Sequence, residues 1–207
     1  MAATATRYLY LVRHGEALPD ESGLSENGRR QADLLGRRLA EYPISVVHHG
    51  PLPRAAQTAG LIGEHLKGAA VRVSETAGDY VPYFPRREEL PADCADFLLR
   101  FLDGWTEEDR EQGPVLARRA LERYTGPVEG EEERHELVVT HNFLVAWLVR
   151  HTTDAPAWRW LGINHANAAL TVIRYAPGRP SSVLVQNDMR HLPAELRWTG
   201  FPPESRV

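Results

Sequence analysis

Short apolar stretches alternate along this chain with stretches whose apolar residues recur at helical spacing. Arg7–Arg13 and Ile44–His48 are apolar runs that end in glycine or proline, as buried strands do. One helix is expected after each of them, the first from its N-cap Ser25 to Pro43 and the second over about Arg54–Leu66. Such alternation predicts an α/β protein with a mostly parallel sheet covered by helices on both faces.

The rest of the chain continues the alternation with a less regular middle. Residues 77–130 are broken by prolines and then favour helices, and 129–136 is an acidic run expected to form a solvated turn. The further expected elements are a strand at Val71–Ser74, helices at Asp93–Trp105 and Val115–Tyr124, a strand at Leu137–Thr140, a helix at Phe143–Arg150, and a hairpin of Ala169–Tyr175 with Val183–Gln186.

Composition excludes several classes of partner and compartment. The formal charge is −4, from 24 Lys and Arg against 28 Asp and Glu, so we expect neither nucleic acid nor an anionic membrane as a partner. Cys94 is the single cysteine, which excludes a disulfide framework and a thiolate metal cluster. The apolar runs Tyr8–Val12 and Phe143–Val149 are too short for a signal peptide or a membrane span. We therefore expect a cytoplasmic protein, whose oligomeric state the sequence does not indicate.

Residues suited to binding phosphate follow three of the expected strands. The first strand ends in Arg13-His14-Gly15-Glu16, Arg54 lies at the start of the helix after the second, and His141-Asn142 follows Leu137–Thr140. Ligands of open α/β sheets bind beyond the carboxyl ends of the strands, and helix N-termini there favour anions. The sequence therefore predicts that these side chains converge on one anion.

Phosphoryl transfer needs this combination of residue types. Arginine stays charged and its planar fork binds two oxygens at once, and a neutral imidazole nitrogen can attack phosphorus to give a phosphohistidine. We expect Arg13, Arg54 and His141 to lower the pKa of His14 and keep it unprotonated. Gly15, which lacks a side chain, would let the backbone approach the substrate. A lone histidine or arginine at a strand end is usually structural, so the prediction rests on their shared context.

Four ordered segments resemble the histidine phosphatase superfamily, also called phosphoglycerate mutase-like. The match runs from about Tyr8 to Tyr175. A lone Arg-His-Gly would be weak evidence for the family, whereas four segments in the correct order are strong evidence. The segments are Arg13-His14-Gly15-Glu16, the first-helix entry Leu24-Ser25-Glu26-Asn27-Gly28-Arg29-Arg30-Gln31-Ala32, the second segment Leu52-Pro53-Arg54-Ala55-Ala56-Gln57-Thr58-Ala59, and Val138-Val139-Thr140-His141-Asn142.

The resemblance implies a three-layer α/β/α sandwich in which His14 is phosphorylated and Arg13, Arg54 and His141 form the phosphate pocket. It implies no metal and no organic cofactor, and it makes 1–207 one domain with 77–130 as a helical and loop insertion near the active site. Many members follow Arg-His-Gly-Glu with Thr and later Asn, where this chain has Ala17-Leu18-Pro19. The long insertions of the mutase branch are absent, so the chain looks like the compact phosphatases.

The family also uses a carboxylic acid to protonate the leaving group, and no motif marks it here. Asp79 in a turn-rich loop is the first candidate, with Glu75 second and Glu16 possible because it adjoins the nucleophile. Tyr83 on the same loop could line the mouth of the site, Glu16 could contact substrate, and Asn142 could cap its helix with its backbone N–H facing the pocket.

Adjacent His48 and His49 do not predict a metal site, because neighbouring strand residues point to opposite faces of a sheet. We expect one of them to be buried and the other to lie at the rim.

The sequence thus predicts a metal-independent phosphomonoester hydrolase that works through a phosphohistidine on His14. A phosphoglycerate-type mutase, a non-catalytic module that binds phosphorylated ligands and, more remotely, a metal-dependent hydrolase are the alternatives. The substrate is expected to be a phosphorylated small molecule or a phosphoprotein. A sugar phosphate, a nucleotide, a phosphoprotein and a lipid-like diphosphate all stay open.

Overall fold

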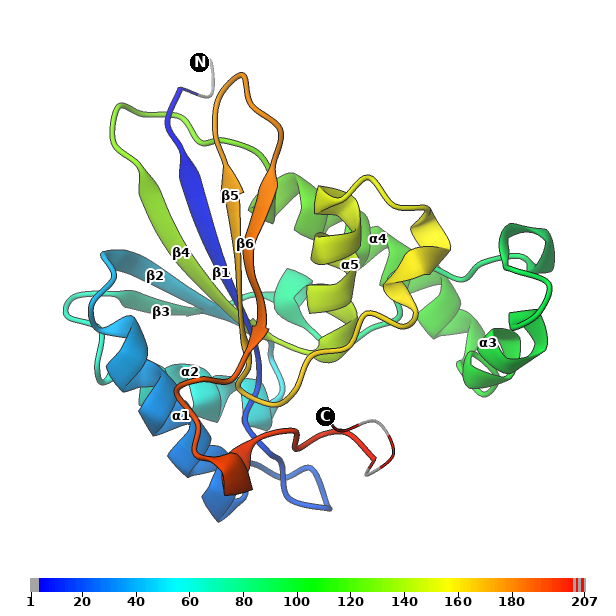
Figure 1. Cartoon of the computed structure of the whole chain (residues 1–207), viewed down its shortest axis with the longest axis horizontal. Coiled ribbons are helices and arrows are strands. Elements are labelled where there is room, and N and C mark those ends of the chain that lie inside the picture. Colours follow the sequence, from blue (N-terminus) through cyan, green and yellow to red (C-terminus); the bar gives the residue numbers. More distant parts are fainter. Residues whose placement is uncertain (1–3, 203, 205, 207) are drawn as a thin grey trace.

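A six-stranded sheet in the order β3-β2-β4-β1-β5-β6 forms the centre of the molecule (Figure 1). The computed structural model describes residues 4–202, 204 and 206. The strands are β1 (Arg7–Arg13), β2 (Ile44–His49), β3 (Ala70–Val73), β4 (Arg134–Thr140), β5 (Leu170–Tyr175) and β6 (Ser182–Asp188). Strands β3, β2, β4 and β1 are parallel, and β5 is antiparallel to both of its neighbours. The predicted mostly parallel sheet and the predicted hairpin are therefore confirmed.

Helices cover both faces of the sheet, which gives the predicted three layers (Figure 1). Helices α1 (Glu26–Leu39) and α2 (Pro53–Gly63) pack on one face, and α4 (Glu107–Tyr124) and α5 (Asn142–Thr152) pack on the other. The two-residue period of a strand explains the two cores. Tyr10 and Val12 of β1 join the first core, and Leu9 and Leu11 join the second.

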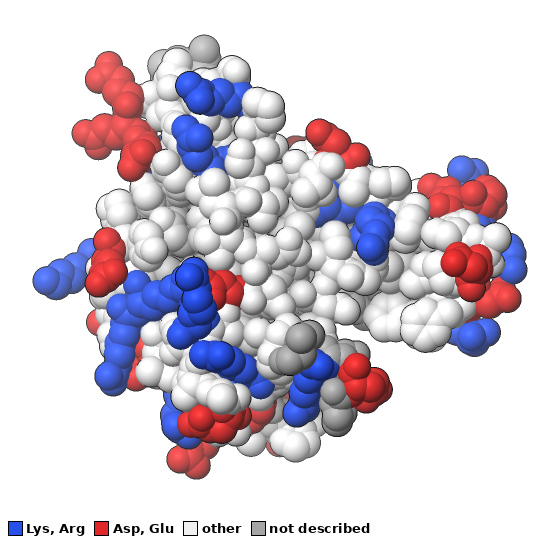
Figure 2. Space-filling model, viewed as in Figure 1, with Lys and Arg blue, Asp and Glu red and all other residues white. Residues whose placement is uncertain are grey.

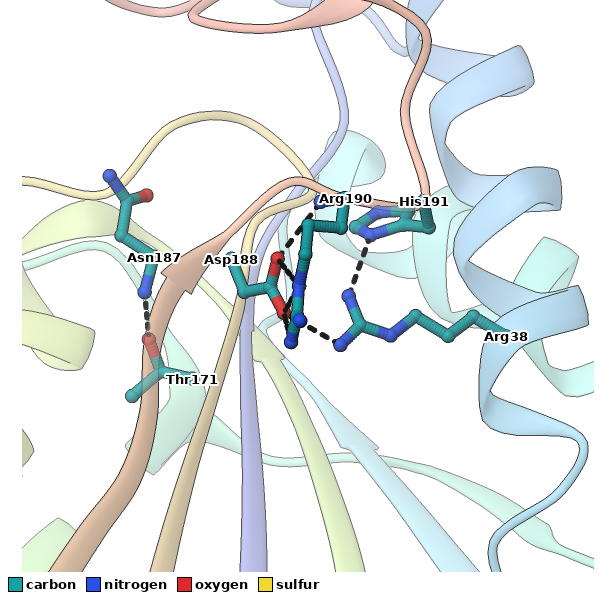
Figure 3. A network of polar contacts seen from close by, with 6 residues as sticks. All are labelled: Arg38, Thr171, Asn187, Asp188, Arg190 and His191. Carbon is teal, nitrogen blue, oxygen red and sulfur yellow. Dashed lines mark hydrogen bonds and ion pairs between the residues drawn. The ribbon is translucent and has the colours of Figure 1, made fainter.

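Polar contacts join helix α1 to the end of the edge strand β6 and to the segment that follows it (Figure 3). Ser25 caps the helix as predicted, since its hydroxyl accepts from the backbone N–H of Gly28 at 3.0 Å. In the last turn, Arg38 binds Asp188 of β6 at 2.7 Å and lies 3.2 Å from Nδ1 of His191. These contacts hold the segment after β6 against α1.

Two elements begin several residues earlier than the sequence predicted. Helix α4 starts at Glu107 instead of Val115, because Thr106 and Asp109 form a reciprocal cap that nucleates the turns before Pro114. Strand β4 starts at Arg134 instead of Leu137, so the acidic run is only partly a turn. Its last residues pair with the start of β1.

Helix α3 (Ala95–Phe101) lies on an arm that extends away from the sheet (Figure 1). Phe97 on this arm is 66% exposed, a large apolar side chain left in solvent. Acidic side chains project where the loop leading to β4 lies, and basic side chains gather over α1 and the C-terminal segment (Figure 2). Over the described residues, no helix combines the length and the apolar character that crossing a membrane requires.

Candidate active site

A cavity of about 420 Å³ opens at the carboxyl ends of β1 and β4, where the sequence placed the anion site. Its walls come from the segments after β1, from α2, from the loop before η2 (Arg87–Glu89), from α5, and from two segments near the C-terminus. The lining residues are Arg13, His14, Glu16, Ala17, Glu21, Arg54, Asp79, His141, Asn142, Phe143, Asn167 and Gly200. All four residues of the predicted phosphate pocket therefore lie in one cavity.

His14 follows β1 and presents one ring nitrogen to this cavity. Its Nδ1 lies 2.7 Å from the carbonyl oxygen of Gly15, a contact in which Nδ1–H donates. Nε2 then holds the lone pair, and Nε–H of Arg54 donates to it at 3.2 Å. Burial, followed by His141, Arg13 and Arg54, lowers the pKa of His14 to about 3. His14 is therefore an unprotonated imidazole at neutral pH.

Arg13 and Arg54 bring their guanidinium groups to the same cavity from β1 and from the start of α2. Arg13 donates to the carbonyl oxygens of His165 at 2.9 Å and of Gly200 at 3.3 Å. Burial and the neighbouring Arg54 lower the pKa of Arg13 to about 10, so it remains cationic near neutral pH. These two side chains give the cavity its positive charge.

His141 precedes α5, and its ring centroid is 5.0 Å from that of His14. Burial, then Arg54 and Arg13, lower its pKa to about 3. Nδ1 lies 3.3 Å from Oδ2 of Asp79, but neither ring nitrogen makes a well-directed hydrogen bond within the described part of the chain. Both nitrogens are thus buried without a hydrogen bond from the described residues, and a ligand in the cavity can supply one.

The backbone after His14 is held by side chains of α2 and α1. The N–H of Gly15 donates to the hydroxyl of Thr58 at 3.0 Å, and the N–H of Glu16 donates to Gln31 at 2.8 Å. A Cβ on Gly15 would lie 2.6 Å from the carbonyl oxygen of Gly28. Gly15 is therefore needed for close packing of this loop on α1, where the sequence suggested close approach to substrate.

The three candidate acids occupy different surroundings. Asp79 lines the cavity, and its Oδ2 accepts from Arg54 at 2.8 Å. Glu16 also lines the cavity, but its carboxylate accepts from the hydroxyl of Ser25 at 2.7 Å. Glu75 is exposed and lines a separate hollow beside α4. The geometry favours Asp79.

Asn142 and Tyr83 have contacts that the sequence did not indicate. Asn142 is the first residue of α5, whose N-cap is His141, so the expectation that Asn142 caps this helix was wrong. Asn142 lines the cavity, and its side-chain oxygen accepts from the N–H of His165 at 2.8 Å. Tyr83 does not line the cavity, because its hydroxyl donates to Glu89 at 2.5 Å and its ring stacks on Trp147.

Several lining residues were not found from the sequence. Glu21 has φ 57° and accepts from Arg54 at 3.2 Å, and Asn167 donates to the carbonyl oxygen of His14 at 2.9 Å. The carbonyl oxygen of Gly200 reaches Arg13 from the C-terminal segment. No local pattern marks these residues, because the tertiary fold brings them to the site from distant positions in the chain.

His48 is buried and His49 is half-buried, as predicted. Among the described residues, no three His, Cys, Asp or Glu side chains are arranged to hold a metal ion.

An α/β/α sheet that gathers two arginines and two histidines at the carboxyl ends of its strands defines a protein that handles phosphate groups. Residues 9–188 match the histidine phosphatase superfamily, branch 1, and the chain belongs to this superfamily. Membership confirms the predicted family and fold, and it supports the predicted class of enzyme, a phosphomonoester hydrolase.

Curated relatives of the chain include the mitochondrial serine/threonine-protein phosphatase Pgam5 of several animals. The relative from Caenorhabditis elegans is 31% identical over 199 residues, which are 92% of this chain and 66% of the relative. The one from Caenorhabditis briggsae is 29% identical over 202 residues, 95% of this chain and 69% of the relative. The chain thus spans about two thirds of the length of these relatives. Because these relatives are named as mitochondrial, the expectation of a cytoplasmic location was wrong.

Solved structures share the fold at lower identity. The phosphoglycerate mutase from Plasmodium falciparum superposes with a TM-score of 0.62 at 19% sequence identity. The match covers 92% of this chain and 96% of the mutase.

Proposed function

We propose that the chain hydrolyses phosphomonoesters through a phosphohistidine formed on Nε2 of His14. The observation that supports this most is the state of that nitrogen. Its lone pair faces the cavity because Nδ1–H donates to Gly15 at 2.7 Å, and burial keeps the ring neutral. A neutral, oriented imidazole beside two guanidinium groups is what attack on phosphorus requires.

In the first step, the Nε2 lone pair forms the N–P bond while the bond from phosphorus to the ester oxygen breaks. The guanidinium groups of Arg13 and Arg54 bind the equatorial oxygens, where charge develops in the transition state. His141, whose ring centroid lies 5.0 Å from that of His14, supplies a further nitrogen to these oxygens. In our proposal Asp79 gives its proton to the leaving alkoxide.

In the second step, water attacks phosphorus and the N–P bond breaks, which returns the electron pair to Nε2. The Asp79 carboxylate takes the proton of that water, and inorganic phosphate leaves. The same carboxyl group thus serves both half-reactions and ends each cycle protonated. The proposal for Asp79 is supported by its place on the wall of the cavity, 2.8 Å from Arg54.

For the substrate we propose phosphoserine or phosphothreonine in a protein. The Pgam5 relatives are named as serine/threonine-protein phosphatases. Phe143 at the edge of the cavity contacts Phe101 and Trp105, which makes an aromatic surface beside the phosphate site. Such a surface can pack against a peptide that carries the phosphate.

The first experiment follows p-nitrophenyl phosphate hydrolysis in EDTA by the wild type, His14→Ala and His151→Ala. His151 is outside the cavity and serves as the matched histidine control. We expect turnover by the wild type and the control and none by His14→Ala. Alkaline quenching followed by mass spectrometry at alkaline pH should find an acid-labile, alkali-stable phosphate on His14 of the wild type. A wild type that folds and binds vanadate without turnover would contradict the proposal.

Asp79→Asn tests the acid separately, because p-nitrophenolate leaves without help from a proton. We expect this variant to lose 10²-fold or more, on the order of a general acid's contribution, against a phosphoserine peptide. These losses are compared as kcat/KM, which reports only the first half-reaction, and the loss against p-nitrophenyl phosphate should be much smaller. Equal losses of kcat/KM against both substrates would show that Asp79 is not the acid of that step.

The substrate class is tested by comparing phosphoserine and phosphothreonine peptides with phosphotyrosine peptides, free phosphoserine and 3-phosphoglycerate. We expect the first two to have the highest kcat/KM. Conversion of 3-phosphoglycerate to its isomer would instead establish a mutase. A free metabolite hydrolysed faster than the peptides would exclude a protein substrate.

A further inference from the structure

A second cavity, of about 460 Å³, opens on the α4 face of the sheet, near the amino ends of β1 and β4. Its floor comes from neighbouring strands, since Arg7 pairs with Arg134, Val46 pairs with Glu136, and His48 pairs with Arg72. Because Arg7 precedes Arg13 by six residues on β1, this cavity is about 20 Å from the phosphate site. The charged and polar residues that line it are Arg7, His48, Arg72, Arg123, Arg134 and Glu136.

We call this second cavity the arginine pocket, because four guanidinium groups and a single carboxylate line it. Glu136 lies 3.0 Å from Nε of Arg7 and 3.9 Å from Arg134, so one carboxylate serves two arginines. Arg72 of β3 and Arg123 at the end of α4 have no ion-pair partner in the described part of the chain. The pocket therefore holds excess positive charge in a protein whose formal charge is −4.

His48 adds an unsatisfied polar group to the floor of the arginine pocket. Its side chain is 6% exposed, and its Nδ1 is buried with no hydrogen-bond partner among the described residues. Burial, followed by Arg123, Arg72 and Arg7, lowers the pKa of His48 to about 4. A buried polar atom without a partner is costly, and a ligand can supply the missing hydrogen bond.

The surroundings limit the size of an anion that fits. The acidic loop of Glu131, Glu132 and Glu133 borders a neighbouring hollow that shares Ser45 and Arg134 with the arginine pocket. These carboxylates would repel a long polyanion such as nucleic acid. Arginine forks match phosphate oxygens. Arg72 and Arg123, which form no ion pair with another described residue, come from separate elements, β3 and α4.

We propose that the arginine pocket binds a small anion with two phosphate groups, such as a pyrophosphate or a nucleoside diphosphate, held between Arg72 and Arg123. Arg7 and His48 form the floor beneath the ligand. This site is separate from the cavity around His14, and binding there does not depend on the proposed hydrolysis.

The test is calorimetric titration with methylenediphosphonate, a diphosphate analogue that hydrolysis cannot consume. We expect two sites on the wild type, one of which competes with vanadate at the His14 cavity. Arg72→Gln/Arg123→Gln should keep the vanadate-sensitive site and weaken the other at least tenfold. Arg37→Gln/Arg118→Gln removes the same charge from exposed positions outside the pocket and should bind as the wild type does.

Hydrolysis of p-nitrophenyl phosphate by Arg72→Gln/Arg123→Gln should equal that of the wild type, because neither residue lines the His14 cavity. Unchanged activity also verifies that this variant is folded. A single, fully vanadate-sensitive site on the wild type would overturn the proposal. So would equal loss of binding in both double variants, or an oligonucleotide that displaces the diphosphonate where ADP does not.

Discussion

His14 stays neutral chiefly because it is buried, and the positive charges around it add to that effect. Removal of an imidazolium from water is costly, and Arg13, Arg54 and the ring of His141 disfavour it further. The sequence indicated the charged neighbours but not the burial. An isolated strand-end histidine exposed to solvent would be partly protonated at pH 6.5, and this one is not.

The protonation of His14 can be measured directly. With its pKa lowered to about 3, the ring should remain the Nδ1–H tautomer from pH 7.5 down to pH 5. We expect the ¹⁵N shifts of His14, assigned with His14→Asn, to stay constant over that range. A titration midpoint near 6.5 would show that the imidazole of His14 is exposed to water and becomes protonated as a free histidine does.

Glu21 competes with substrate for Arg54. Its carboxylate accepts from NH1 of Arg54 at 3.2 Å while 71% of its side chain is exposed. A phosphoryl oxygen must replace this contact, which is worth little because it is solvated. Glu21→Gln should therefore bind inorganic phosphate roughly two- to fivefold more tightly, with little change in kcat.

The matched control is Asp20→Asn, which removes the same charge from the same loop. Asp20 binds Ser22 and not Arg54. The inhibition constants for inorganic phosphate distinguish the two explanations. An equal increase in phosphate affinity in both variants would mean that only net charge matters.

At the scale of elements, the phosphate site depends on how closely α1 approaches the loop after β1. A Cβ on Gly28 would lie 2.0 Å from the carbonyl oxygen of Glu16. Backbone therefore packs on backbone at this point, with the Gly15 N–H held by Thr58 on the other side. Any side chain at position 28 must push the helix away from the loop that orients His14.

Gly28→Ala should lower the free energy of unfolding by about 1–3 kcal/mol through overpacking, and it should reduce kcat/KM through displacement of His14. Gly60→Ala is the matched control, because its added Cβ would meet nothing within 4 Å and alanine favours a helix. Urea unfolding and p-nitrophenyl phosphate kinetics measure both variants. Equal stability and activity of Gly28→Ala and the wild type would refute the close contact.

The sequence predicted most elements because their patterns are local. The strand over Arg7–Arg13 and the Ser25 cap match the structure, since apolar runs and capping residues act within a few positions. The contacts of the loop after Asp79, and the lining residues that come from the C-terminal part of the chain, were less predictable. Tyr83 turns to Glu89, while Asn167 and Gly200 reach the site through the tertiary fold, which no short pattern encodes.

At the scale of the whole molecule, several buried histidines make the fold sensitive to acid. Burial lowers the pKa of His14, His141 and His165 to about 3, and that of His48 and His191 to about 4. In the unfolded chain these groups take up protons below about pH 6.5, where the folded chain does not. The free energy of unfolding must therefore fall as the pH drops from 6.5 toward 4.

His165→Phe isolates one of these histidines, since both of its ring nitrogens are buried without a hydrogen-bond partner in the described residues. Each such histidine contributes about 1.4 kcal/mol per pH unit to the loss. Urea unfolding at pH 7 and pH 5 should show a smaller loss for His165→Phe than for the wild type, whatever its absolute stability. Equal losses would mean that His165 is protonated in the folded protein.

The strand order of the sheet also determines when β1 can pair with its neighbours during folding. β1 lies between β4 and β5, so its neighbours begin only at Arg134 and Leu170. During synthesis β1 leaves the ribosome before β4 and β5, so both of its edges stay open until these strands have followed. A strand with open edges pairs readily with other chains, and such distant pairing forms slowly. Early exposure of β1 thus makes chaperone protection of the nascent chain most valuable before β4 is complete.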